Sequence, residues 1–103
     1  MGTVLTELRA NVARLRESLW TQTQDMEGDL LKDPLPPMLA ITLCKSESIW
    51  REIEQCYGNI LAIDPGDPVQ GEIVELRALY LDLNDRSHIA IEESQAEEDA
   101  RLL

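Results

Sequence analysis

Apolar residues recur every three or four positions over residues 67–95, and this is the strongest pattern in the chain. The pair Asp67-Pro68 precedes it, and both residues are typical of a helix start. We expect Asp67 to cap the amide of Gln70, and the Gln70 side chain to reach back to the amide of Asp67. The pattern therefore predicts a long amphipathic helix. Its expected buried face consists of Val69, Ile73, Leu76, Tyr80, Leu83, Ser87 and Ala90.

Two earlier segments have the same period. Residues 3–31 carry a narrow, heptad-like stripe, and residues 37–62 carry two parallel rows. Two rows widen the apolar face, so the middle helix is expected to touch two neighbours. The stripe of the first helix is Leu5, Leu8, Val12, Leu15, Leu19, Gln22 and Met26. The rows of the second are Leu39, Thr42, Ser46, Ile49, Ile53 and Cys56, and Leu43, Trp50 and Tyr57.

Prolines separate the three helices. The sequences DPLPP at 33–37 and DPGDP at 64–68 cannot continue an α-helix, because each proline removes a donor and restricts the residue before it. Gly58-Asn59 either ends the second helix or lies inside it, and we favour one more turn after it. Residues 96–103 are an acidic tail, which opposes the helix dipole and is expected to fray or to be helical only when bound.

These elements predict an all-α fold in a single domain spanning residues 1–103. Short connections imply an up-down-up order of helices. The result is either an antiparallel three-helix bundle closed on itself or a long helical hairpin layer completed by dimerisation. The first and third helices would each reach roughly 40 Å, which favours the layer and a homodimer.

The charge of the chain restricts its partners. With 20 acidic and 9 basic side chains, the formal net charge is −11 at pH 7. This charge repels phosphate backbones and anionic lipid surfaces, so direct binding to nucleic acid or to a membrane is not expected. Apolar residues make up 44% of the chain, which contains no Phe. We therefore expect a core built mainly from Leu and Ile.

Cysteine use and hydropathy indicate a cytoplasmic location. Cys44 and Cys56 lie twelve residues apart on one predicted helix. That spacing corresponds to about 18 Å along the helix axis, too far for a disulfide between them, and free thiols are typical of the cytoplasm. No signal peptide and no membrane-spanning segment is expected, because no apolar run is long enough.

Catalytic and metal-binding chemistry find little support. The one histidine, His88, has Asp85 and Glu92 on the same helical face, but a metal site needs three or four convergent ligands. We expect His88 to face solvent, and we expect no metal and no cofactor. No nucleophile-base pair and no phosphate-binding glycine loop is present, so the protein is expected not to be an enzyme.

Large aromatic side chains and the acidic tail are the candidate partner-binding residues. Trp20 and Trp50 each lie at the edge of an apolar stripe, where tryptophan can close a core or mark a partner-facing patch. We expect Trp50 to close the core, and Trp20 fits either role. The full set of candidate partner-binding residues is Trp20, Trp50, Tyr57, Tyr80, Glu92, Glu93, Glu97 and Glu98.

The layout resembles flagellar and type III export chaperones of the FlgN and FliT type. The similarity lies in a long first helix, the segment LCKSESIW in the second helix and LNDRS in a long polar third helix. It covers most of the chain and is one of architecture and pattern. It implies that the late surface of the third helix would hold a secretion client, and it assigns no role to any individual residue.

Two hypotheses about function follow. The first is a non-catalytic adaptor or chaperone-like protein that binds another protein, or its own second copy, through apolar helix faces. The alternative is an acidic inhibitor that mimics nucleic acid, as phage anti-defence proteins do, and binds a basic site on its target. Binding by an inhibitor of this kind should weaken steeply with salt, whereas groove binding should depend on salt far less. A small metal-dependent enzyme using His88 is a third, less favoured hypothesis.

Overall fold

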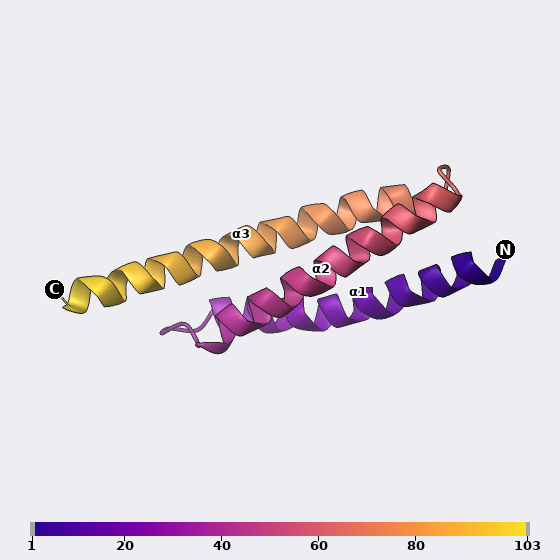
Figure 1. The fold of residues 1–103 in the computed structure, drawn as a ribbon. Coiled ribbons are helices and arrows are strands. Elements are labelled where there is room, and N and C mark those ends of the chain that lie inside the picture. The colour runs from indigo at the N-terminus through magenta and orange to yellow at the C-terminus, as the bar shows by residue number, and fades with distance from the viewer. Residues whose placement is uncertain (1, 103) are drawn as a thin grey trace.

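Three helices form the structure, and they match the segments that the periodicity indicated. The computed structural model describes residues 2–102, with side chains from residue 4 onward. It contains α1 (Gly2–Leu30), α2 (Met38–Ile63) and α3 (Val69–Leu102), with no strand within this range (Figure 1). The predicted all-α fold is confirmed. Every residue of the predicted stripes is buried or half-buried.

The proline-containing segments connect the helices where the sequence indicated. Residues 31–37 join α1 to α2, which begins directly after Pro37. α2 then continues through Gly58 to Ile63, as favoured from the sequence, and its end is closed by Asp64, whose amide donates to the carbonyl of Ile60 at 2.8 Å. The Asp64 carboxylate accepts the Gly66 amide at 3.2 Å, which tightens the turn into α3.

Asp67 caps α3, but it bonds to a different amide from the one expected. Its Oδ1 accepts the Val69 amide at 3.0 Å, while the Gln70 amide donates to the backbone carbonyl of Asp67 at 3.3 Å. The amide of Asp67 donates to Asp64 instead of to the Gln70 side chain, so the predicted reciprocal cap is wrong. The buried Asp67 carboxylate also forms an ion pair with Arg9 of α1. This pair fixes the start of α3 against the first helix.

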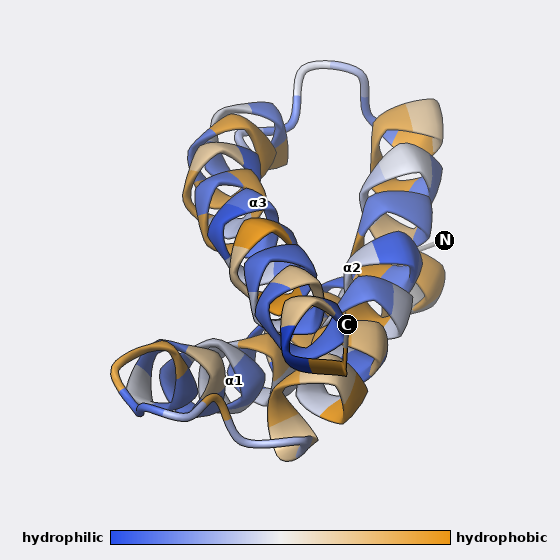
Figure 2. Cartoon of the chain, turned by 90° about the vertical axis from the view of Figure 1, so that its left-hand side faces the viewer, coloured by the Kyte–Doolittle hydropathy of each residue, from blue (hydrophilic) through white to orange (hydrophobic). Residues whose placement is uncertain are grey.

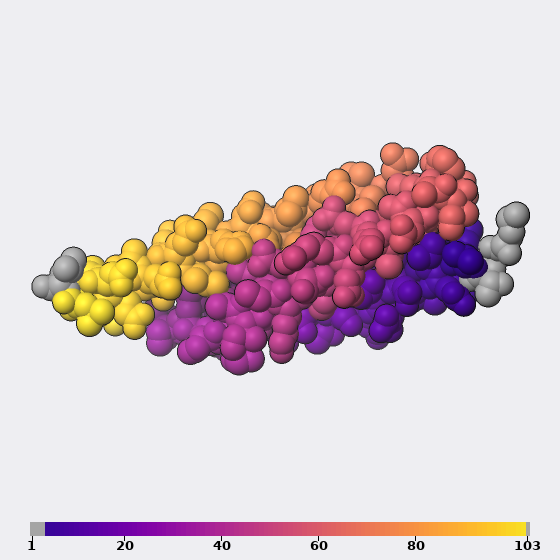
Figure 3. All heavy atoms as spheres, viewed as in Figure 1, coloured from indigo at the N-terminus to yellow at the C-terminus, as the bar shows by residue number. Residues whose placement is uncertain are grey.

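The helices run up, down and up along an elongated molecule. α1 and α3 point the same way, with α2 antiparallel to both (Figure 1). The chain measures 62 × 18 × 18 Å and has a radius of gyration of 16.9 Å. A compact domain of this length would have about 13 Å, so the molecule is a rod (Figure 3).

α2 holds the bundle together. It packs extensively against α1 and also against α3, whereas α1 and α3 contact each other less. Viewed toward its end, the molecule has α2 beside both other helices, with α1 set to one side of α3 (Figure 2). The two apolar rows give α2 a face wide enough to contact both neighbours. Ser46 of one row and Trp50 of the other both contact Tyr80 of α3.

The core consists of two apolar clusters, and on α2 the buried Ser46 lies between Leu43 of one and Trp50 of the other. The larger cluster contains Val12, Leu15, Leu19, Trp50, Ile53, Tyr57, Ile60, Val69, Ile73 and Tyr80. The smaller one, toward the connection between α1 and α2, contains Met26, Leu39, Leu43 and Leu83. Leu30, Leu35 and Ile91 pack against the smaller cluster.

A buried hydrogen-bond network joins α2 to α3 at the boundary of the two clusters. Ser46 Oγ donates to the carbonyl of Leu43 at 2.7 Å and lies 3.2 Å from the Tyr80 hydroxyl. Asn84 Nδ2 donates to the same hydroxyl at 3.2 Å. Tyr80 also stacks on Trp50, with ring centroids 5.1 Å apart. These directional contacts set the register of α3 on α2.

α3 continues beyond the helix end that the sequence suggested. The helix was expected to end near residue 95, but it continues to Leu102; Leu103 lies outside the described residues. Residues 95–102, which we call the C-terminal overhang, are all exposed, and α3 projects past the connection between α1 and α2 (Figures 1 and 3). No proline or glycine interrupts this segment, and the opposing dipole term is only about 0.3–1 kcal/mol per charge.

The hydropathy of the three helices was compared with that of membrane-spanning segments. Within residues 2–102, no helix contains an apolar stretch of the length needed to cross a bilayer.

Candidate functional site

An open hollow between α1 and α3 is the main candidate site. It has a volume of about 550 Å³, and we call it the α1–α3 groove. It exists because both helices pack mainly on α2 and less on each other. The residues that line it are Ala13, Arg16, Glu17, Leu19, Trp20, Thr23 and Glu27 of α1, and Leu76, Leu79, Tyr80, Asp82, Leu83 and Arg86 of α3.

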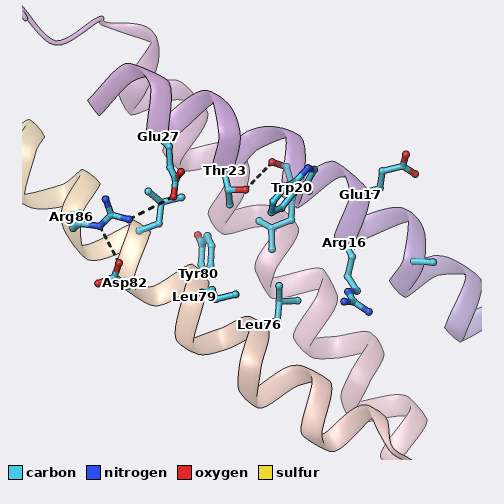
Figure 4. A pocket seen from close by; sticks show the side chains of 13 residues that line it. Arg16, Glu17, Trp20, Thr23, Glu27, Leu76, Leu79, Tyr80, Asp82 and Arg86 are labelled. Atoms are coloured by element: carbon cyan, nitrogen blue, oxygen red, sulfur yellow. Dashed lines mark hydrogen bonds and ion pairs between the residues drawn. The ribbon is translucent and has the colours of Figure 1, made fainter. Parts of the chain in front are cut away.

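Two exposed apolar side chains line the groove above an apolar floor. Trp20 of α1 is 64% exposed and Leu79 of α3 is 74% exposed. Figure 4 shows Trp20 directed from α1 toward the space in which Leu79 and Tyr80 of α3 lie. Leu19, Tyr80 and Leu83 are buried and form the floor. A large indole beside a leucine over such a floor is the composition of a protein-binding hot spot.

Ion pairs connect α1 and α3 at both ends of the groove. Arg16 lies 3.5 Å from a carboxylate oxygen of Glu72 at one end. At the other end, Arg86 lies 3.8 Å from Glu27 across the groove and 3.0 Å from Asp82 on its own helix (Figure 4). The distance from Arg16 to Glu27 along α1 corresponds to about three helical turns, or roughly 16 Å. The apolar part of the groove lies between these pairs.

The two tryptophans occupy equivalent places in the sequence pattern but different environments. Trp50 is 6% exposed and stacks on Tyr80, so it closes the core as expected. Trp20 is mostly exposed, which makes it the available aromatic of the predicted set. The difference arises because α2 has a neighbour on each side, whereas the edge of the α1 stripe faces the groove.

Two aromatic residues of the predicted partner-binding set are buried in the core. Trp50 and Tyr57 belong to the larger cluster and are only 6% and 1% exposed, so neither is available to a partner in the way that Trp20 is. Tyr80 is also buried, although its ring forms part of the groove floor. The hydroxyl of Tyr57 has no hydrogen-bond partner among the described residues. Burial raises the pKa of both Tyr57 and Tyr80 above the ordinary tyrosine value.

The predicted acidic residues lie on the last turns of α3, away from the groove-lining set. Glu93, Glu97 and Glu98 line a separate, mainly polar hollow of about 460 Å³ between α3 and residues 32–37. Lys32 and Arg101 line the same hollow. Glu92 is exposed outside it. The structure therefore does not bring the acidic candidates together with Trp20.

The remaining candidates for chemistry are dispersed. His88 is half-exposed, as predicted, and its Nε2 lies 3.6 Å from Glu47 of α2. Across residues 2–102, no three His, Cys, Asp or Glu side chains are placed to hold a metal ion. Cys44 is exposed and Cys56 is half-buried, and both are free thiols.

Leu79 is the exposed apolar groove residue that the sequence interpretation missed. The charged lining residues were not predicted either; they are Arg16, Glu17, Glu27, Asp82 and Arg86. Leu79 lies outside the buried stripe of α3, which passes through Leu76, Tyr80 and Leu83. A signal for it is nevertheless present, because Leu76, Leu79 and Leu83 form a second row at helical spacing. A second row on α3 indicates a wider apolar face than one neighbouring helix needs to cover.

Comparison with known proteins adds no family assignment. No family model matches the chain, and neither a curated protein nor a solved structure is significantly similar to it. The resemblance to export chaperones stays a prediction, and the site is interpreted from its own geometry.

Proposed function

We propose that this protein is a non-catalytic adaptor or chaperone-like protein that holds an amphipathic helix of a partner protein in the α1–α3 groove. The observation that carries the proposal is the pair Trp20 and Leu79, both largely exposed over a floor of buried apolar residues. Exposed apolar groups gathered in one hollow are typical of protein interaction sites.

The exposed area of the chain supports this proposal. A compact monomer of 11.6 kDa would expose about 5,800 Å². This chain exposes 7135 Å². The excess, about 1,300 Å², is larger than the roughly 800 Å² that one partner buries in a standard protein interface. The excess follows from the elongated shape, which leaves more helix surface open to a partner than a globule of this mass would.

The dimensions of the groove suit a helix better than an extended chain. A helix of about three turns presents apolar residues at i, i+3 or i+4, and i+7 along one side, which matches the length between the two ion-paired ends. Two flanking helices above a third also present the ridges against which another helix packs. A second copy of this chain, as in the expected homodimer, is an alternative occupant of the same groove.

Photocrosslinking tests the proposal. Benzoylphenylalanine incorporated in place of Leu79 should crosslink, in the native cells, to a segment of another protein that forms an amphipathic helix. The matched control is the same group in place of Ile89, which is also exposed on α3 but lies outside the groove. A crosslink of equal yield from both positions, or from position 89 alone, would contradict the proposal.

The affinity for the crosslinked partner should then depend on the groove residues. Trp20→Ala is expected to weaken binding about 30-fold, the roughly 2 kcal/mol of a typical tryptophan hot spot. Leu79→Ala should weaken it less, and Ile89→Ala should leave it within about two-fold. Isothermal titration calorimetry measures all three. Because these side chains are exposed, circular dichroism should show that each variant retains its helices.

A second candidate function is the acidic inhibitor, and the exposed carboxylates near the end of α3 favour it. The last turns of α3 project into solvent (Figure 3) and carry four exposed glutamates, Glu92, Glu93, Glu97 and Glu98. Such an end could contact a basic site on a target. Replacement of these four residues by Gln would then abolish binding, while Trp20→Ala would not change it. The same replacements should have little effect on groove binding.

A further inference from the structure

The charged side chains around the α1–α3 groove are unequal in number. We define the groove rim as Arg16, Glu17, Glu27, Glu72, Asp82 and Arg86. It has four carboxylates and two guanidinium groups, and each side chain except Glu17 takes part in an ion pair. The rim therefore has an excess of two negative charges.

Both arginines of the rim are already engaged by carboxylates. Arg16 pairs with Glu72, and Arg86 is shared between Glu27 and Asp82. At the Arg86 end, two carboxylates share one cation. At the Arg16 end, Glu17 has no ion-pair partner within the described part of the chain. The Arg86 end thus offers one carboxylate charge without a cation of its own. The Arg16 end offers that of Glu17, an exposed side chain that Figure 4 draws on the outer side of α1.

This distribution disfavours a second copy of the chain as the occupant. Each copy has a formal charge of −11, and its own exposed helix faces are rich in acidic residues. A helix from such a copy would bring more carboxylates against a rim that has no free cation, and like charges facing each other across an interface are strongly unfavourable. An acidic partner helix is disfavoured for the same reason.

We propose that the occupant of the α1–α3 groove is a basic amphipathic helix, with apolar anchors in its middle and a Lys or Arg near each end. This inference rests on the proposed function and specifies the chemistry of the partner. The anchors contact Trp20 and Leu79, and the two cations contact Glu17 at one end and the Glu27–Asp82 pair at the other.

The spacing of the rim carboxylates fixes the pattern expected in the partner. Glu17 and Glu27 are ten residues apart on α1, which corresponds to about 15 Å along the helix axis. A partner helix lying along the groove would therefore place its cations about ten residues apart. The interval leaves room for three apolar anchors at i, i+3 or i+4, and i+7.

Three synthetic peptides test this inference. Each is a helical peptide of about 14 residues without Trp or Tyr, with Leu at three anchor positions and Ala or Gln elsewhere. One residue on each side of the anchors is varied, and these two residues lie about ten positions apart. Both are Lys in the first peptide, Gln in the second and Glu in the third. Binding is followed by the fluorescence of Trp20, which should shift to the blue as a bound peptide covers it. The buried Trp50 should change little.

The Lys-flanked peptide is expected to bind about ten-fold more tightly than the Glu-flanked one at low salt, with the Gln-flanked peptide between them. Raising the ionic strength to about 1 M should remove most of the difference, because exposed charges are then screened. Some affinity should remain at high salt for all three peptides, because the apolar anchors are unaffected.

A pair of variants distinguishes the effect of a rim carboxylate from the effect of the net charge of the protein. Glu17→Gln should reduce the advantage of the Lys-flanked peptide by about two- to three-fold, which is one exposed ion pair. Glu7→Gln is the matched control. It changes the net charge equally and lies on the same helix, but Glu7 does not line the groove. Equal effects of the two variants would overturn the assignment of the cation to Glu17.

The outcomes distinguish this inference from the proposed function. Equal binding of the Lys- and Gln-flanked peptides, sensitive to Trp20→Ala, would overturn the inference and leave the proposed function standing. Binding of none of the peptides would count against both. Light scattering tests whether the chain forms a dimer that Trp20→Ala converts to a monomer. That result would place a second copy in the groove and overturn the inference.

Discussion

The hydroxyl groups of Tyr57 and Tyr80 have opposite environments within the same core. Tyr80 accepts a hydrogen bond from Asn84 and shares one with Ser46, whereas the Tyr57 hydroxyl is buried without a partner among the described residues. A buried polar group without a partner costs free energy, and a paired one contributes only modestly. Two residues of one type therefore have different effects on stability, and the difference depends on a few neighbouring atoms.

This contrast gives a matched prediction. Tyr80→Phe should lower the free energy of unfolding by about 1–2 kcal/mol, because two hydrogen bonds are lost. Tyr57→Phe removes the same atom and should leave the free energy of unfolding unchanged within about 0.5 kcal/mol, or raise it. Urea unfolding followed by circular dichroism measures both. No loss for Tyr80→Phe would show that the network at Ser46 does not stabilise the fold, and a clear loss for Tyr57→Phe would show that the Tyr57 hydroxyl has a partner in solution.

The site residues also show how far single positions could be interpreted from the sequence. Trp20 was among the predicted residues, with core closure and partner contact both open. Leu79 was missed because it lies beside the regular stripe of α3. Both residues are assigned to the site because their side chains are exposed. Exposure depends on where the neighbouring helix lies, and the spacing of residues within one helix does not specify that.

At the level of helices, the period of apolar residues determined which face of each one is buried. α2 is the informative case, because its two rows predicted two neighbours and it packs against both α1 and α3. It also contains Gly58 in its interior, where the sequence allowed either a cap or a continuation. The helix continues, with no positive φ at any described residue.

The position of Gly58 gives a prediction about helix stability. A Cβ atom at this position would meet nothing within 4 Å, so Gly58→Ala adds no steric conflict. It should raise the free energy of unfolding by about 0.5–1 kcal/mol, because glycine loses more backbone entropy than alanine in a helix interior. The measurement is thermal or urea unfolding.

Gly28→Ala is the control for Gly58→Ala. Gly28 is equally free of neighbours but lies in the last turn of α1, where helices fray. Its substitution should have a smaller stabilising effect. If Gly58→Ala proved destabilising, α2 would not be a continuous helix in solution.

As a whole, the molecule is a rod whose surface is large for its mass and whose charge is strongly negative. The core occupies the region where all three helices overlap, and the C-terminal overhang extends beyond it (Figure 1). Stability and surface chemistry are therefore separated along the rod. The core holds the helices together, and the overhang contributes charge without packing.

Shortening the chain tests this separation. Removal of residues 95–103 should change the free energy of unfolding by less than about 0.5 kcal/mol, because every described side chain in that range is exposed. Removal of residues 91–103 also deletes Ile91, which packs on the smaller cluster, and should cost about 1 kcal/mol or more. Urea unfolding compares both with the full chain. Equal losses in the two shortened chains would show that the overhang itself stabilises the core.

The three helices, the turns at the prolines between them and the buried face of each helix could all be predicted from the amino-acid pattern. These properties depend on local features: backbone donors, proline geometry and a period of 3.6 residues. Three other properties could not be predicted in this way: Trp50 is covered while Trp20 is exposed, Asp67 pairs with Arg9, and α1 and α3 leave a groove between them. Those outcomes depend on the relative placement of helices far apart in the chain. The pattern within one helix specifies which side must be covered, but it does not specify how completely a neighbour covers it.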